Sequence, residues 1–135
     1  MNTGRFAAAV AATFVARTAL NSLFYGVLVA GQWEHVHQTH PGVFREVIPA
    51  YIAADLLFAV IFVFFLTKVG AALGGGPKGG AVLGFFVALM GPALVNVYMF
   101  YSVLFFSLGM AWSDSLFALI NGVVAGAVAG AVYKT

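Results

Sequence analysis

The residues best suited to chemistry are two opposite charges that lie inside long apolar segments. Arg17 interrupts the segment 6–30, and Asp55 lies within the segment 47–69. A charge near the centre of a membrane-spanning helix costs roughly 2.5–3.5 kcal/mol on insertion scales, so it normally has a partner and often a role. Because the arginine side chain is long, it can reach Asp55 when the two segments form adjacent helices. We therefore predict an Arg17–Asp55 pair inside the membrane.

Asparagine side chains extend this pair to the remaining apolar segments. Asn21 follows Arg17 by four residues, so the two share one face of a helix. Asn96 and Asn121 add one amide to each of the two later segments. The sequence predicts a buried polar network of Arg17, Asn21, Asp55, Asn96 and Asn121. Two interpretations are open: the network fixes the register of the helices, or Asp55 binds a proton or cation, with Arg17 as its counter-charge or as an anion site.

A second candidate site is a histidine-rich stretch that follows the first apolar segment. It contains Glu34, His35, His37 and His40, which are ligand types that zinc and copper accept. In extended backbone His35 and His37 would point to the same side. The spacing matches no established metal site, so the alternative is a solvated or interfacial loop that contacts a partner. The chain has no cysteine, which excludes thiolate metal sites.

The elements that position these residues follow from composition. Hydrophobic residues make up 63% of the chain and charged residues only 7%, whereas about a quarter of a soluble domain is charged. Stretches of about 20 apolar residues suffice to cross a bilayer as a helix. The stretches that meet this length are about 6–30, 47–69, 81–108 and 115–133. We expect an all-α integral membrane four-helix bundle that forms a single domain over 1–135.

Charge in the connections predicts the orientation of this bundle. The N-terminus, the middle connection and the C-terminus share one side of a four-span protein. These three places hold the basic residues Arg5, Lys68, Lys78 and Lys134. The other two connections are predicted to hold Glu34, Glu46 and Asp114, with Arg45 as their one strong base. The positive-inside rule therefore places both termini in the cytoplasm, in what we expect to be a bacterial inner membrane.

Small residues predict how the helices pack. Gly122, Gly126 and Gly130 recur every four residues in the last segment and form a smooth face. Such faces allow close approach of helix backbones, either within one bundle or against a second copy or another subunit. In the third segment Gly91-Pro92 predicts a kink, because proline removes a backbone donor and clashes with the preceding turn.

The layout resembles that of small four-span bacterial membrane proteins without an assigned activity, in which an aromatic pair ends the first helix, here Phe24-Tyr25. This resemblance covers most of the chain and implies a fold but no activity. In size the chain is also similar to small multidrug transporters and bacterial fluoride channels. The former carry an essential glutamate in the first span, where this chain has Arg17.

Three functions are compatible with these patterns. We favour a non-catalytic accessory or structural subunit that packs against a larger membrane complex. The alternatives are a small homo-oligomeric transporter or channel that uses the Arg17–Asp55 pair, and metal binding through the histidine stretch. No nucleophile–base constellation indicates an enzyme, and no cofactor is required, although a bound lipid or pigment is open. The expected partners are the lipid bilayer and other membrane subunits or a second copy; a net charge of +2 gives no argument for nucleic acid.

Overall fold

The computed structural model describes residues 2–42 and 47–134, and all the regular structure in them is helical. Arg45 and Glu46, two of the charges used to predict orientation, lie outside the described residues. Two of the helical elements, η1 and η2, are single π-helical turns. In chain order the elements are α1 (Thr3–Leu23), η1 (Phe24–Leu28), α2 (Ala30–Thr39), α3 (Ile48–Val69), α4 (Gly76–Ala88), η2 (Leu89–Ala93), α5 (Leu94–Ser102) and α6 (Leu108–Tyr133).

Within the described part of the chain, four continuous helical stretches are long and apolar enough to cross a membrane. They are Thr3–Leu28, Ile48–Val69, Gly76–Ser102 and Leu108–Tyr133. Their outer surfaces are apolar: Met90, for example, is 75% exposed and Leu28 is 68% exposed. A surface of this kind is solvated by hydrocarbon rather than by water. The protein is therefore a small multi-pass membrane protein with the all-α fold that the sequence predicted.

The ends of two spans differ from the prediction. The third span ends at Ser102, and the fourth begins at Leu108 instead of residue 115. The earlier start has a local cause, because the Ser107 hydroxyl accepts a hydrogen bond of 3.2 Å from the backbone N–H of Met110 and caps the helix. Asp114, which we expected in a connection, therefore lies inside α6 and is only 4% exposed.

The histidine stretch also differs from the prediction. It forms the helix α2 instead of a loop, and it follows η1 after a break at Val29, where φ is −117°. Val36 on the inner face of α2 packs into a cluster with Phe106 and Met110 from the other end of the chain. The contact with this distant apolar cluster supplies burial that the polar stretch lacks by itself.

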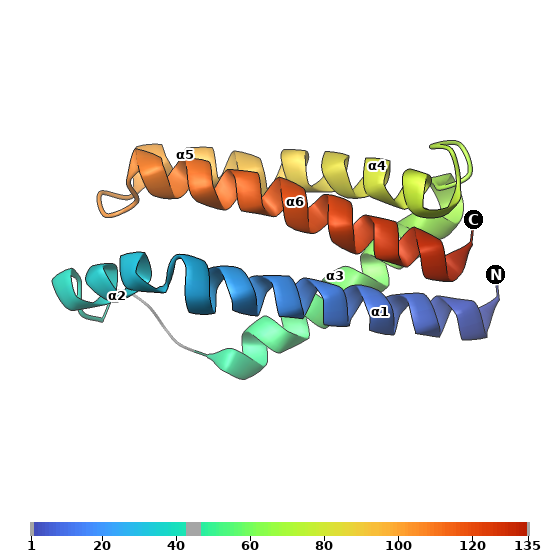
Figure 1. The fold of residues 1–135 in the computed structure, drawn as a ribbon. Coiled ribbons are helices and arrows are strands. Elements are labelled where there is room, and N and C mark those ends of the chain that lie inside the picture. Colours follow the sequence, from blue (N-terminus) through green and yellow to red (C-terminus); the bar gives the residue numbers. More distant parts are fainter. Residues whose placement is uncertain (1, 43–46, 135) are drawn as a thin grey trace.

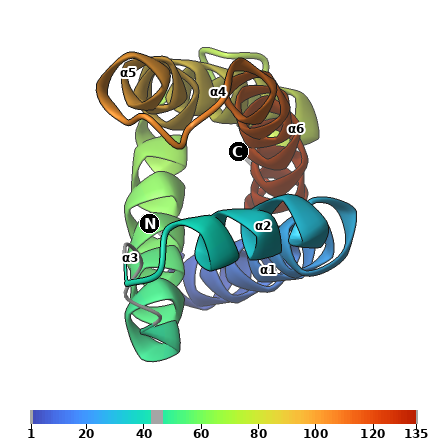
Figure 2. The ribbon, with the colours of Figure 1, turned by 90° about the vertical axis from the view of Figure 1, so that its left-hand side faces the viewer.

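The helices form a bundle in which α3 is the least closely packed member. Viewed along the bundle, α1, α3, the α4–α5 unit and α6 surround the interior (Figure 2). α6 packs chiefly on α4 and on α1, whereas the main neighbour of α3 is α1. α3 crosses the other helices at a steep slant, and both termini lie at the same end of the bundle (Figure 1). We call the opposite end, where α2 lies, the α2 end.

The slant of α3 divides it into a packed half and an open half. Near the termini, Phe62, Val63 and Leu66 of α3 are buried in a core with Ala9 of α1 and Ala129 of α6. At the other end of the helix, residues 47–54 are all exposed. The first two turns of α3 therefore project away from the bundle.

The glycine face of α6 is occupied by α4. A Cβ atom added at Gly122 would lie 2.5 Å from the carbonyl oxygen of Gly84 and 2.6 Å from the Cβ of Ala88. An added Cβ at Gly126 would overlap the carbonyl oxygen of Gly80, and one at Gly130 would overlap that of Gly76. We call this contact the glycine seam. Backbones can approach so closely only where neither helix carries a side chain.

Candidate functional site

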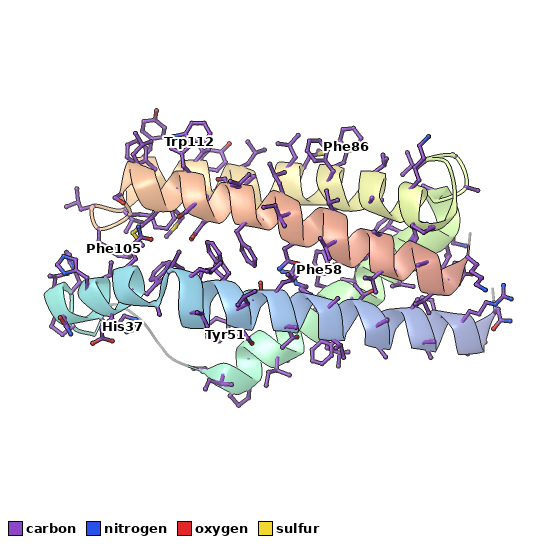
Figure 3. The ribbon with its side chains drawn as sticks, viewed as in Figure 1. His37, Tyr51, Phe58, Phe86, Phe105 and Trp112 are labelled. Carbon is purple, nitrogen blue, oxygen red and sulfur yellow. The ribbon has the colours of Figure 1, made fainter. Side chains whose placement is uncertain are left out.

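Arg17 and Asp55 meet in the interior of the bundle. The Nε–H of Arg17 on α1 donates to Oδ1 of Asp55 on α3 at 2.6 Å, and the two side chains are 20% and 16% exposed. The guanidinium carbon of Arg17 also lies 4.0 Å from the centre of the Phe58 ring, which follows Asp55 by about one turn of α3. Figure 3 shows Phe58 in the interior, between α1 and α6, whereas Phe86 and Trp112 project outward. α3 thus offers the arginine both a carboxylate and an aromatic face.

Two asparagines continue the polar contacts to a third helix. The Nδ2 group of Asn21 donates to Oδ2 of Asp55 at 3.0 Å. The Nδ2 group of Asn121 on α6 donates to Oδ1 of Asn21 at 2.8 Å. Hydrogen bonds therefore link α3, α1 and α6 in the order Arg17, Asp55, Asn21, Asn121, which we call the polar chain. Both carboxylate oxygens of Asp55 therefore accept a hydrogen bond, one from Arg17 and the other from Asn21.

A cavity of about 100 Å³ lies beside the polar chain. Its walls come from α1 and η1, from α3, from the continuous α4–η2–α5 unit and from α6. The lining residues are Arg17, Asn21, Tyr25, Phe58, Ala88, Pro92, Asn96, Asp114, Phe117, Ala118, Asn121 and Gly122. Asn96, predicted in the network, faces this cavity from α5 and does not bond to the polar chain. At Gly91-Pro92, where a kink was predicted, the structure has the π-helical turn η2, and its Pro92 is part of the cavity wall.

Asp114 is the cavity residue that the sequence analysis missed. It lines the cavity from α6, is 4% exposed, and its Oδ1 atom has no hydrogen-bond partner among the described residues. Asn121 shares this property: it is 2% exposed, and its Oδ1 atom is likewise without a partner there. Ser107, a good N-cap residue ahead of an apolar run, was the signal that could have placed Asp114 inside the helix.

Aromatic rings form the wall near η1. Phe24 is 8% exposed and stacks on Phe117 of α6, with ring centres 4.0 Å apart. Tyr25 lines the cavity, and its ring meets the edge of Phe117 at 5.8 Å and of Trp33 at 6.3 Å. The aromatic pair that ends the first span is therefore split between a packing role for Phe24 and a cavity-lining role for Tyr25.

The histidine stretch provides no comparable arrangement. On the helix α2, His35 and His37 are two residues apart, which turns them about 200° from one another. Glu34 accepts a hydrogen bond from Gln38 at 2.8 Å, and the His40 ring lies 5.6 Å from that of Phe105. Figure 3 shows His37 and Phe105 at the α2 end, far along the bundle from Phe58. The expectation that His35 and His37 share a side in extended backbone is wrong. Over residues 2–42 and 47–134, no three His, Cys, Asp or Glu side chains are grouped so that they could hold a metal ion.

Compared with known proteins, the chain matches no family model, no curated protein and no solved structure.

Proposed function

We propose that this protein transports a small cation or a proton across the membrane, with Asp55 as the group that binds it and Arg17 as the counter-charge. The observation that carries the proposal is the position of the Arg17–Asp55 pair: it lies within two membrane spans and is 20% and 16% exposed, beside a polar cavity that all four spans line. Ionisable residues in such positions often mark an ion pathway or a proton relay.

The geometry gives this pair a way to act as a switch. Asp55 accepts hydrogen bonds from Arg17 and Asn21, so its negative charge is compensated in the resting arrangement. A proton or cation on Asp55 would compete with Arg17 for the carboxylate and release the arginine. Because Asn21 is bonded to Asn121, a change at α3 would be transmitted to α6. The ligand would then shift the bundle between two arrangements by binding one of them better.

A purely structural role explains less of the site. Hydrogen bonds between helices in membranes average about 0.6 kcal/mol, so the polar chain contributes little to the association of the helices. The glycine seam already holds α4 and α6 in register without polar contacts. A network that served only to fix the helices would also not need a cavity next to it, because voids reduce packing energy.

The test is ion flux into vesicles. Purified protein is reconstituted into liposomes that contain a pH-sensitive dye, and proton and alkali-cation gradients are applied. Asp55→Asn is expected to reduce the flux at least tenfold while the protein still folds, because the amide keeps the shape of the carboxylate and can still accept from Arg17. Glu34→Gln, an exposed acid-to-amide change on α2, is the matched control and should leave the flux unchanged. Vesicles with wild-type protein that conduct no better than those with Asp55→Asn would refute the proposal.

A second candidate function is the accessory subunit that the sequence favoured. The glycine seam no longer supports it, since that face is filled within the chain. It is supported instead by the projecting turns of α3, because residues 47–54 are exposed on every side of the helix. A neighbouring subunit could cover them, as could lipid. Purification from native membranes in mild detergent tests this function: a stoichiometric second polypeptide supports it, and a discrete homo-oligomer argues against it.

We also propose that the protein lies in the inner membrane of a bacterium with its termini in the cytoplasm. What supports this placement is the gathering of Lys68, Lys78 and Lys134 at the connections on the side of the termini. In this orientation the α2 end faces outward.

A further inference from the structure

Asp114 is an acid inside a membrane span that forms no ion pair within the described part of the chain. It is 4% exposed, its Oδ1 atom has no hydrogen-bond partner among the described residues, and the one ion pair within that part of the chain joins Arg17 to Asp55. A buried carboxylate without a partner is strongly disfavoured, so such a group either takes up a proton or binds a cation. We therefore expect Asp114 to bind a proton or a cation.

Asn121 lies on the same wall and also has a buried oxygen without a described hydrogen-bond partner. Its Oδ1 atom is an acceptor without a described partner, and it is 2% exposed. Asn121 follows Asp114 by two turns of α6, so both lie on one face and about 10 Å apart along the helix. Both residues line the cavity of about 100 Å³, which is room for several waters at roughly 30 Å³ of liquid volume each. Water there could bond to both oxygens.

Among the residues that line the cavity, Asp114 is the one acid. α1 contributes Arg17, which pairs with Asp55 of α3. η1 contributes Tyr25, and the α4–η2–α5 wall contributes the neutral Asn96. No described group of three metal-ligating side chains exists that could replace the water shell of a metal ion. A proton needs only one acceptor oxygen and contact with water. The cavity is lined by Asp114 and also by Arg17 and Asn21, the two residues that donate hydrogen bonds to Asp55.

We infer that Asp114 is a protonation site that exchanges protons with Asp55 through water in the cavity. A hydronium ion on the α2 side transfers its proton to Asp114, which forms an O–H bond and leaves water. The acid then gives this proton to cavity water, and the water gives a proton to Asp55, whose hydrogen bond from Arg17 is released. The inference rests on the proposed function and names the proton as the ion transported.

Infrared difference spectroscopy tests the site directly. The sequence has only four Asp and Glu residues, so each carboxyl signal can be assigned by substitution. Full-length protein in detergent micelles is titrated with acid and base. We expect a protonated-carboxyl C=O band that converts to carboxylate as the pH rises, is lost in Asp114→Asn and is shifted in Asp114→Glu. Glu34→Gln, the exposed control on α2, should retain the band.

Three results would overturn the inference: the band does not appear in wild-type protein, it persists unchanged in Asp114→Asn, or it responds to sodium or methylammonium at constant pH instead of to pH. Circular dichroism and size exclusion check that Asp114→Asn is folded. If it is not, the wild-type titration and the band shift in Asp114→Glu still decide the question.

Flux measurements separate this inference from the proposed function. The infrared titration needs no gradient, so a titrating Asp114 in a protein that carries no flux would refute the proposed function and leave the protonation site standing. If Asp114→Asn left the proton flux unchanged, Asp114 would not be part of the proton pathway, and the proposed transport through Asp55 would be unaffected. We expect this substitution to reduce proton flux at least tenfold.

Discussion

The two halves of α6 show how one helix can build two opposite environments. Toward the C-terminus it presents Gly122, Gly126 and Gly130 to α4, and the backbones are in direct contact. Toward the N-terminus it presents Asp114 and Asn121 to a cavity of about 100 Å³. The segment that faces α6 also differs between the two regions. Beside the seam it is the regular helix α4, whereas beside the cavity it includes Pro92 in the π-helical turn η2.

Close packing and polar space in this bundle depend on different parts of the sequence. The seam needs small residues on both helices, since one added carbon would overlap backbone. The cavity needs an irregular helix on one side, because a proline inside a helix removes a hydrogen bond and redirects the chain. Rigidity in the first region holds the helices that surround the second.

The strongest test of the comparison is a leucine in the seam. We expect Gly126→Leu to destabilise the fold by at least about 3 kcal/mol, because overpacking a core typically costs 1–3 kcal/mol and the atom struck here belongs to the backbone. Gly26→Leu is the matched control, since a Cβ at Gly26 meets nothing within 4 Å. Thermal and denaturant unfolding in detergent measure the difference. Equal stability of the two variants would show that the seam does not hold the bundle.

An intermediate effect is expected from the ion pair on the other side of the comparison. Arg17→Gln and Asp55→Asn should each lower the free energy of unfolding by about 1–3 kcal/mol, because each leaves a partly buried charge without an opposite charge beside it. The double variant should lose less than the sum, since residues in contact typically show coupling energies of 0.5–3 kcal/mol. A double-mutant cycle in detergent measures the coupling. Strict additivity would mean that the contact between Arg17 and Asp55 contributes nothing to stability.

The smallest effect is expected where the polar chain reaches α6. Asn121→Ala removes one hydrogen bond between helices, so we expect a loss of about 0.6 kcal/mol. Asn96→Ala is the control, because Asn96 faces the same cavity without joining the polar chain. Chemical denaturation in detergent measures the free energy of unfolding of both variants. A loss at Asn121 as large as that of Gly126→Leu would make the polar chain, and not the seam, the main support of α6.

Several features of the site followed from the sequence because few arrangements satisfy them. Four long apolar stretches in a chain with 7% charged residues leave a membrane bundle as the fold, and the structure confirms the four spans. Arg17 and Asp55 were expected to meet because each is costly alone in a span, and the structure brings them within 2.6 Å. Asn21 was placed beside them by helical spacing alone.

Other features depended on contacts between distant segments. The polar α2 is helical where Val36 meets Phe106 and Met110, a contact that no local pattern encodes. The role of the glycine face was open between a contact within the chain and one with a second copy until α4 was found against it.

The hydrocarbon surroundings of this protein, its four candidate spans and the partner of Arg17 could all be predicted from the sequence, because they follow from the cost of placing polar groups in hydrocarbon. The tertiary structure alone decided where space remains between the helices. It brought Asp114 into the wall of a cavity, because the position of that wall depends on how a capped α6 meets the α4–η2–α5 unit with its π-helical turn. A one-dimensional pattern gives the faces of each helix, whereas a cavity is a property of several faces together.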